Sequence, residues 1–431
     1  MKRSKKRFAK SFEYWSKAEK LIPAGTQTLS KGPDQFVKGA YPVYLKSGKG
    51  SHVFDVDGNE YIDYPLALGS VILGYRYPRV NEAIVKQLKE GIVFSLMHPL
   101  EVEVSELLTE VIPCAEMVRF GKNGADATSA AVRVARAYTG REKIAYCGYH
   151  GWQDWYIVTT SRDKGVPNAL RNYICPFEFN KIETLDKVFE ENKGEVAAII
   201  MEPMGVEEPR NGFLGKVKEL AHENDALLIF DEIVTGFRLA MGGAQEYFKV
   251  TPDLACFGKG MANGMPLSAV VGRKEVMKLF DEVFFSVTFG GEALSLAAAL
   301  ATIREIKEKN VIKHIWEKGS KLQKGYNKLA EEIGVNTRSI GFPPRMIFTF
   351  KDQGSDSLEM KSLFFQEAVK RGVLFGNVTF ISYSHTDDDI QKSLEVCGDV
   401  LKILKKAVDE NKVKKLLEGE VAKEVFRKVM A

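Results

Sequence analysis

Lys259 and Asp231 are the two residues best suited to chemistry on a carbonyl compound. Lys259 lies between Gly258 and Gly260, directly after a short apolar run. Glycine on both sides lets the backbone approach a ligand closely, and a partly buried lysine favours the neutral amine that forms Schiff bases. Asp231 ends another apolar run, where a carboxylate in a low dielectric needs a cationic partner.

Two further segments add groups that bind a flat, phosphorylated ligand. Gly121–Ala127 joins a predicted strand at 117–120 to a predicted helix at 128–138, and such a turn directs backbone N–H groups at a phosphate. It does not match the G-x-G-x-x-G fingerprint of dinucleotide-binding folds. Tyr149 follows a predicted strand at 143–146, where an aromatic ring could stack on the ligand.

Each of these features alone also has a structural explanation. Lys259 could be an exposed loop lysine, and Asp231 could cap a helix or form a structural salt bridge. The Gly121–Ala127 segment could be a plain turn, and Tyr149 could pack in the core. Together, however, they describe a phosphate cradle, an aromatic plate, a buried carboxylate and a Schiff-base lysine. This set suits pyridoxal phosphate, whose phosphate, ring, ring nitrogen and aldehyde each need one such partner.

The elements that position these residues alternate between helices and unbroken apolar runs, as in sheets buried on both faces. The predicted strands are 117–120, 143–146, 196–201, 226–230, 254–257 and 269–271, and the predicted helices are 80–89, 101–111, 128–138 and a long helix from about 292. We therefore predict an α/β fold with a mostly parallel central sheet. Ligands bind such sheets beyond the carboxyl ends of the strands.

The two chain ends predict smaller α+β structure. The expected elements are a helix at 8–22, strands at 43–45, 51–55, 61–63, 345–350 and 378–382, and helices at 357–371, 386–407 and 412–429. Asp57-Gly58-Asn59 predicts a hairpin turn. The domain prediction is an N-terminal helix and small antiparallel sheet at 1–75, a large α/β domain at 76–328 and a small α+β domain at 329–431.

Composition excludes several classes of protein. The 431 residues include 61 Lys and Arg against 57 Asp and Glu, and this net charge of +4 gives no large field for nucleic acid or acidic lipid. The longest nearly apolar stretch, Ala293–Ile303, is about half of the roughly 20 residues that a membrane span needs. No apolar segment follows the basic N-terminus, so we expect no secretory signal.

Cysteine and histidine spacing gives no metal site. The five cysteines form no C-x-x-C pair, and no two of the six histidines are four residues apart. We therefore expect neither a disulfide framework nor a metal, and a reducing cytoplasm is the expected location.

Longer ordered motifs run from about residue 20 to about residue 400. They are Asp55–Asp63, Arg133–Arg141, Tyr149–Gly151, Leu228–Arg238, Pro252–Asp253 with Gly258–Lys259, and Ser384–Ile390. With these motifs the sequence resembles the class-III pyridoxal-phosphate aminotransferases of fold type I, most closely the glutamate-1-semialdehyde 2,1-aminomutase branch. The resemblance implies a large domain with a mostly parallel sheet and a smaller α+β domain built from both chain ends.

The resemblance also implies a cofactor, pyridoxal 5'-phosphate, and roles for the matching residues. Lys259 would form the Schiff base, Asp231 would keep the pyridine nitrogen protonated, and Tyr149 would stack on the ring. The remaining cofactor contacts would come from Asn123, Gly124, Ala125, Glu202 and, across a homodimer with shared active sites, Thr288.

Departures from the family pattern gather on the substrate side. The arginine that grips the substrate carboxylate in the aminomutase aligns with Lys31, a glutamate near the gate aligns with Asn377, and an active-site tryptophan aligns with Leu68. The phosphate loop, Ser-Gly-Thr in the family, reads Asn123-Gly124-Ala125 and loses two hydroxyl donors. The segment Met204–Pro209 is shorter than its counterpart and lacks an asparagine beside the cofactor.

Three functions compete on this basis. The first is an aminotransferase that moves an amino group between an amino acid donor and an aldehyde or keto acceptor, with a sugar or polyol as a candidate. The second is glutamate-1-semialdehyde 2,1-aminomutase, which moves the amino group within one molecule. Lys31 favours the first, because arginine grips a carboxylate at two points and lysine offers a point charge. The third, a non-catalytic regulator, is disfavoured by the presence of Lys259 and Asp231.

Overall fold

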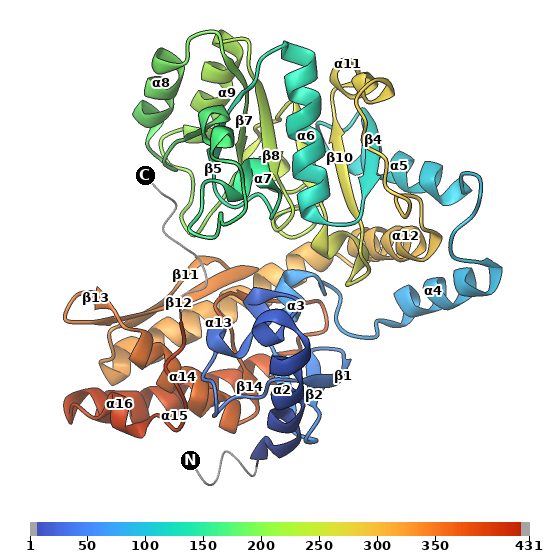
Figure 1. The fold of residues 1–431 in the computed structure, drawn as a ribbon. Helices are drawn as coiled ribbons and strands as arrows, with labels where there is room; N and C mark the ends of the chain where they lie inside the picture. Colours follow the sequence, from blue (N-terminus) through green and yellow to red (C-terminus); the bar gives the residue numbers. More distant parts are fainter. Residues whose placement is uncertain (1–6, 424–431) are drawn as a thin grey trace. The chain divides into compact units, whose positions relative to one another are not determined.

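The structure is a computed structural model that describes residues 7–423, and these residues form two compact units (Figure 1). The first unit holds the described residues of 1–68, 72–77 and 313–426, and the second holds 69–71 and 78–312. The first unit thus combines both ends of the chain, as the resemblance implies. The predicted boundary after residue 328 falls inside helix α13 (Val311–Ile333), and the three-domain assignment stays a prediction.

The second unit is built on a sheet with the strand order β4-β10-β9-β8-β7-β5-β6. Its strands are β4 (Met117–Gly121), β5 (Lys143–Cys147), β6 (Ile174–Pro176), β7 (Val196–Met201), β8 (Leu227–Asp231), β9 (Leu254–Phe257) and β10 (Ser268–Gly272). The strands from β9 to β6 are parallel, and β10 is antiparallel to both of its neighbours. The predicted, mostly parallel α/β sheet is therefore confirmed.

Helices cover the sheet of the second unit, and Figure 1 shows α6 crossing one of its faces. They are α4 (Pro78–Glu90), α5 (Pro99–Val111), α6 (Gly124–Thr139), α7 (Asp154–Ile157), α8 (Ile182–Glu191), α9 (Phe213–Glu223), α10 (Ala244–Phe248), α11 (Lys274–Met277) and α12 (Ala293–Glu308). Small α6 residues such as Ala127 and Ala131 share one buried cluster with Ile144 of β5 and Ile200 of β7. Cover on both faces explains why all six residues of β7 are buried.

The first unit contains two small sheets, β1-β2-β3-β14 and β11-β12-β13 with β15 beside β12. Its elements are α2 (Ala9–Leu21), β1 (Leu45–Lys49), β2 (His52–Asp55), β3 (Glu60–Asp63), α3 (Leu66–Gly69, which ends in the second unit), β11 (Thr337–Phe342), β12 (Arg345–Asp352), β13 (Ser355–Asp356), α14 (Leu358–Lys370), β14 (Val373–Leu374), β15 (Thr379–Phe380), α15 (Asp387–Asp409) and α16 (Val413–Leu416). The antiparallel pairing of β2 with β3 confirms the hairpin predicted at Asp57–Asn59.

The helix predicted at 412–429 is wrong over most of its described length. Helix α16 ends at Leu416, and Leu417 is extended. Side-chain contacts replace the helical hydrogen bonds there, because Gln366 donates to the Leu416 carbonyl and accepts from the Glu418 N–H. Residues 424–429 of that prediction, and residues 1–6 of the basic N-terminus, lie outside the described residues. No helix within 7–423 has the length and apolar character to cross a bilayer.

Candidate active site

The sheet brings Asp231 and Lys259 to the same edge. Asp231 is the last residue of β8 and pairs in parallel register with Cys256 of β9. Lys259 follows β9 after one glycine, so it lies just beyond the carboxyl end of the strand beside Asp231. Its φ is +42°, in the left-handed region that favours glycine. Such a conformation in a non-glycine residue is a feature of functional sites.

His150 is the partner of the Asp231 carboxylate, and its role was missed from the sequence. Its Nδ1 lies 2.9 Å from Oδ2 of Asp231 and its Nε2 lies 3.2 Å from the Cys147 carbonyl oxygen. Both residues are buried. In the tautomer with hydrogen on Nδ1, His150 donates to the Asp231 carboxylate and fixes its orientation. The available signal was a histidine just after a strand end, one residue beyond Tyr149.

Tyr149 and Glu202 meet at the ends of the neighbouring strands β5 and β7. The Tyr149 N–H donates to Oε1 of Glu202 over 3.0 Å. Gly148 has a φ of +107°, and a Cβ there would lie 3.0 Å from the same oxygen. The Tyr149 side chain is 44% exposed and lies edge-on to Tyr156. The backbone is thus fixed by Glu202, and the phenol ring projects at the sheet edge.

The start of α6 forms an amide cradle, defined here as Asn123, Gly124 and Ala125. The Asp126 carboxylate accepts the N–H groups of Lys122 and Asn123 over 3.0 and 2.8 Å and so fixes the first turn. Gly124 and Ala125 are the first two residues of the helix, where N–H groups have no intrahelical acceptor. These donors and the helix dipole favour an anion.

Two close packing contacts join the cradle to the other site residues. Gly151 has a φ of +110°, and a Cβ there would lie 2.6 Å from Cβ of Ala125. Ile233, which the sequence did not single out, lies within 3.2 Å of a Cβ built on either Gly124 or Gly258. Its N–H donates to Oδ1 of Asp231 over 3.1 Å. The structure therefore assembles the cradle, Tyr149, Glu202, Asp231 and Lys259 around one edge of the sheet.

Three predicted residues lie elsewhere in the chain. Thr288 is exposed in a turn between β10 and α12, and the structure of a single chain does not unite it with the cradle. Lys31 and Asn377 belong to the first unit. Lys31 ends a short 3-10 helix, and the Asn377 amide donates to Oε1 of Gln35 over 3.2 Å. The substrate-binding roles of Lys31 and Asn377 stay predictions.

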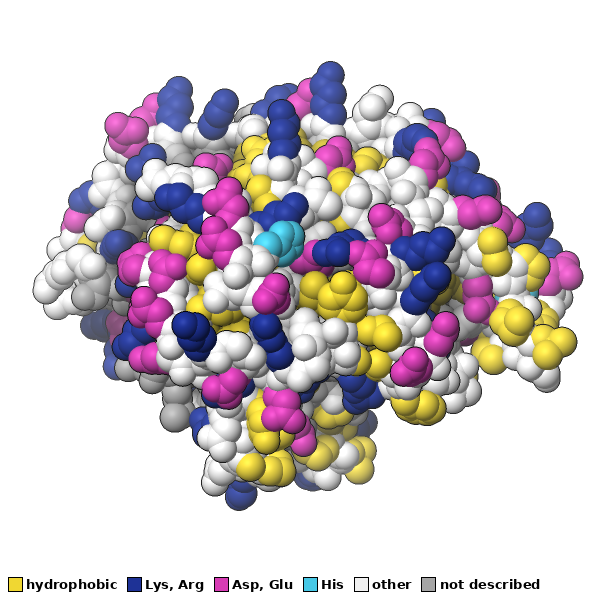
Figure 2. Space-filling view, turned by 90° about the horizontal axis from the view of Figure 1, so that it is seen from above, with side chains coloured by type: hydrophobic (Ala, Val, Ile, Leu, Met, Phe, Trp, Pro, Cys, Tyr) yellow, Lys and Arg dark blue, Asp and Glu magenta, His cyan; other side chains and the backbone are white. Residues whose placement is uncertain are grey.

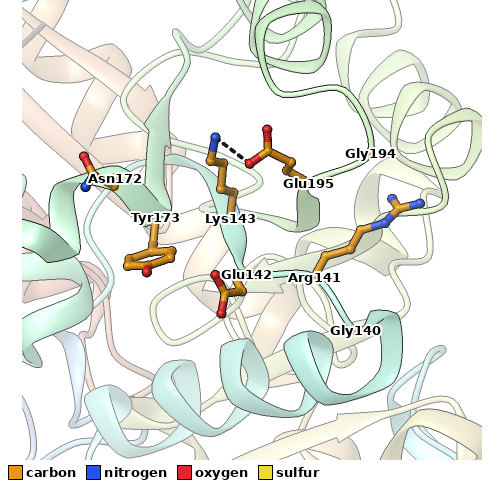
Figure 3. Close-up of a pocket in the computed structure, with 8 residues that line it drawn as sticks. All are labelled: Gly140, Arg141, Glu142, Lys143, Asn172, Tyr173, Gly194 and Glu195. Atoms are coloured by element: carbon orange, nitrogen blue, oxygen red, sulfur yellow. Dashed lines mark ion pairs between the residues drawn. The ribbon is translucent and has the colours of Figure 1, made fainter.

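A concave surface lies at the opposite, amino edge of the same sheet (Figure 3). It is lined by Gly140, Arg141, Glu142, Lys143, Asn172, Tyr173, Gly194 and Glu195. Figure 3 shows Lys143 and Glu195 directed at one another, and they form an ion pair of 2.8 Å. Because ligands of open α/β sheets bind at the carboxyl edge, we do not assign this surface to catalysis.

Known proteins are similar to this chain in sequence and in fold. The Aminotransferase class-III family matches residues 36–401. The chain is 39% identical to 3-aminobutyryl-CoA aminotransferase of Cloacimonas acidaminovorans, over 93% of this chain and 99% of the relative. It is 38% identical to glutamate-1-semialdehyde 2,1-aminomutase of Alkaliphilus oremlandii, over 92% and 99%.

Solved structures agree with this match. The pyridoxal-phosphate internal-aldimine form of the Sphingopyxis sp. MTA144 FumI protein superposes with a TM-score of 0.87 at 26% identity, over 93% of this chain and 98% of that one. A transaminase with pyridoxal phosphate bound gives 0.86 at 25%, over 94% and 99%. The carboxyl edge of the sheet fits pyridoxal phosphate. It offers an amide cradle for the phosphate, a buried carboxylate for the ring nitrogen and a lysine for the aldehyde.

Proposed function

Because the chain belongs to the class-III aminotransferase family, we propose that it moves an amino group between an amino acid donor and a separate aldehyde or keto acceptor. Its cofactor is pyridoxal 5'-phosphate, as the family and the cofactor-bound neighbours indicate. The observation that carries the proposal is the convergence of Lys259, the Asp231–His150 pair and the amide cradle at one sheet edge. The fold is that of fold type I.

Each site residue has one proposed task. When bound, the cofactor supplies an aldehyde that exchanges between amines and a ring that accepts electrons. Lys259 would hold the cofactor at its aldehyde, and its Nζ would move the proton. Asp231, fixed by His150 and the Ile233 N–H, holds the proton on the pyridine nitrogen.

The remaining contacts bind and orient. The Gly124 and Ala125 amides hold the phosphate, with Asn123 at the start of the helix. The Tyr149 ring stacks on the pyridine ring, and Glu202 fixes the Tyr149 backbone.

Substrate-side residues favour transfer between molecules over the aminomutase reaction. An aminomutase must hold one carboxylate while nitrogen moves between carbons, and Lys31 gives a weaker geometric grip than the arginine it replaces. Asn377 is neutral and is hydrogen-bonded to Gln35, so it adds no charge there. The alternative remains glutamate-1-semialdehyde 2,1-aminomutase, which a relative of nearly equal identity represents.

We also propose a homodimer with shared active sites, supported by an exposed apolar surface around α4, α5 and Thr288. Figure 2 shows hydrophobic side chains gathered at its right edge, where Figure 1 draws α4 and α5. The surface comprises Val85, Leu88, Ile92, Val93, Phe94, Leu96, Met97, Val102, Phe284, Val287 and Phe289, with Met97 83% exposed. Exposed apolar residues gathered in this way are typical of protein–protein contact. A second copy that covers it would bring Thr288 to its partner's phosphate.

The location proposed for the enzyme is the cytoplasm. All five cysteines, which lie within the described residues, are free thiols. Free thiols are typical of a reducing compartment.

A half-reaction screen tests the function. Enzyme loaded with pyridoxal 5'-phosphate is mixed with single amino acids, and loss of the absorbance band of the lysine-bound cofactor identifies the donor. A keto sugar, an aldehyde polyol and the thioester 3-aminobutyryl-CoA, taken from the relative's name, then probe the second substrate. We expect amination that depends on a separate donor. Efficient formation of 5-aminolevulinate from glutamate-1-semialdehyde alone would establish the aminomutase instead.

A further inference from the structure

Lys122 and Glu292 form a mostly buried ion pair that the proposed reaction does not use. Lys122 Nζ lies 3.1 Å from Oε2 of Glu292, and the two side chains are 15% and 11% exposed. Lys122 immediately precedes the amide cradle, and its N–H is fixed by Asp126 together with the N–H of Asn123. One end of the pair is therefore rigidly attached to the first turn of α6.

Glu292 occupies the N-cap of α12. Its carboxylate accepts the N–H groups of Leu294 and Ser295 over 2.7 and 3.2 Å and the Ser295 hydroxyl over 2.5 Å. Burial alone would raise the pKa of Glu292, but hydrogen bonds from Ser295 and Lys122 outweigh it, and the pKa lies below its usual value. Glu292 is thus an ionised, fully engaged partner for Lys122.

The segment before Glu292, residues 284–291, is the loop that carries Thr288. Its near end is fastened to β4 and α6, because Arg119 donates to the Phe285 carbonyl over 2.8 Å and Arg133 to the Phe284 carbonyl over 2.6 Å. Its far end is fastened by the Lys122–Glu292 pair. Arg119 lies on β4, Arg133 lies on α6 and Lys122 lies in the turn between them, so both anchors belong to the segment that carries the cradle.

The same anchor reaches the exposed apolar surface. The N–H of Ala293, the residue after Glu292, donates to the Ile92 carbonyl over 2.9 Å. Ile92 begins the exposed stretch that continues through Phe94 and Met97. A displacement of Lys122 would therefore be transmitted to both parts of the apolar surface, the 284–291 loop and the segment after α4.

We propose that Lys122 and Glu292 are positioning residues that link the amide cradle to the association surface, so that a phosphate in the cradle and a second copy of the chain strengthen each other's binding. The proposal rests on the function and dimer proposed above. Linkage of this kind is reciprocal, because each ligand that favours the ordered arrangement favours the other.

Lys122→Met is the direct test, since it removes the ion pair and leaves the α12 cap intact. The dimer dissociation constant is measured by sedimentation for the cofactor-free chain, with inorganic phosphate, and with pyridoxal 5'-phosphate. In the wild type we expect each ligand to tighten the dimer, by about tenfold or more for the cofactor, within the usual range of coupled binding. In Lys122→Met the ratio of the dimer dissociation constants without and with the cofactor should fall at least about fivefold. Lys122→Arg should restore the wild-type ratio.

A matched control lies on the same helix. Lys307→Met breaks the exposed Lys307–Glu110 pair of 2.5 Å between α12 and α5. This variant should leave the effect of each ligand on the dimer dissociation constant unchanged. If Lys122→Met folds poorly, Glu292→Gln removes the charge and keeps an acceptor for the cap. If the folded Lys122 or Glu292 variants keep the wild-type effect of ligand on dimerisation, or if Lys307→Met loses it equally, the role of the Lys122–Glu292 pair is wrong. The proposed function is not affected by either result. A wild type that stays monomeric, or that binds the cofactor independently of Lys259, overturns the proposed function as well.

Discussion

The amino and carboxyl edges of the seven-stranded sheet both carry charged side chains, but those side chains have different surroundings. At the amino edge, Lys143 pairs with Glu195, and Arg141 donates to the carbonyl oxygens of Val196 and Asn224. These contacts satisfy the charges within the chain. At the carboxyl edge, Lys259 has a strained backbone, and the first amides of α6 point away from the helix without intrahelical acceptors.

Topology explains this difference. In a parallel sheet, the helix that follows a strand begins near the carboxyl edge, so helix N-termini and their positive dipole ends gather there. The Tyr149–Gly151 turn then adds His150 against Asp231 and brings Gly151 against Ala125. The amino edge therefore holds charges that are paired within the chain, whereas the carboxyl edge holds amides without intrahelical acceptors, as expected of an anion site. Paired substitutions at the two edges test this distinction.

The largest expected effect compares the two strand-flanking lysines. Lys259→Ala should lose the absorbance band of the lysine-bound cofactor and at least about a thousandfold of turnover, because the nucleophile is gone. Lys143→Ala, at the start of β5, should change turnover by less than about twofold, since its ion pair is partly exposed. Absorbance spectra and steady-state kinetics on both variants check this. Retention of the band in Lys259→Ala would assign the cofactor to another lysine.

The next effect compares two carboxylates. Asp231→Asn keeps the shape of the side chain but removes the charge that holds the ring proton, so turnover should fall about 10²- to 10³-fold while the cofactor still binds. Glu195→Gln at the amino edge should leave turnover near the wild-type value. Pre-steady-state measurement of proton abstraction from a deuterated donor separates the chemical step from binding. An Asp231→Asn enzyme with wild-type proton abstraction would contradict the assigned role.

The positions of residues at strand ends could be predicted where the sequence pattern is local. Lys259, Asp231, Tyr149 and the cradle were placed at strand ends from apolar runs and turns alone, and the parallel sheet then brings those ends together. The helix predicted at 412–429 failed because contacts from Gln366, about 50 residues away, replace its hydrogen bonds. A contact with a residue so far away in the chain leaves no periodic pattern within residues 412–429.

The residues missed at the site show the same limit. His150 contacts Asp231 at the end of β8, and Ile233 packs against Gly124 at the start of α6 and Gly258 just after β9. Their spacing along the chain carries no pattern that predicts these contacts. Lys122 was likewise ordinary in the sequence, because its partner Glu292 lies 170 residues away.

The third effect compares two glycines with positive φ. Gly151→Ala places a Cβ 2.6 Å from Cβ of Ala125 at a φ of +110°, so strain and overlap together should cost about 3 kcal/mol and weaken cofactor binding. Gly140→Ala, in the amino-edge surface, has a φ of +67° and no described atom within 4 Å of the new Cβ, so only about 1 kcal/mol is expected. Urea unfolding measures the free energy of unfolding of each variant, and titration measures its affinity for the cofactor. An equal loss of unfolding free energy in the two variants would mean that the Gly151–Ala125 contact is not tight.

The smallest effect compares the buried histidines of the two units. His150 lies against Asp231, whereas the His385 ring accepts the Ser382 N–H over 3.1 Å and stacks on Tyr64. Burial lowers the pKa of His385 to about 4, and nearby Asp389 only partly opposes this. The unfolded chain takes up a proton near the ordinary histidine pKa of about 6.5, so acid favours unfolding between these two values.

The free energy of unfolding should therefore fall as the pH falls. Between pH 7.5 and pH 5 the wild type should lose about 2 kcal/mol of unfolding free energy that His385→Gln, which has no titrating ring, does not lose. Urea unfolding of both proteins at the two pH values isolates this difference from all other titrating groups, since those are shared. An equal loss in the two proteins would show that His385 takes up its proton in the folded state as readily as in the unfolded chain. The first unit would then accommodate a charged His385 although no carboxylate is hydrogen-bonded to its ring among the described residues, and the contrast between the two histidines would fail.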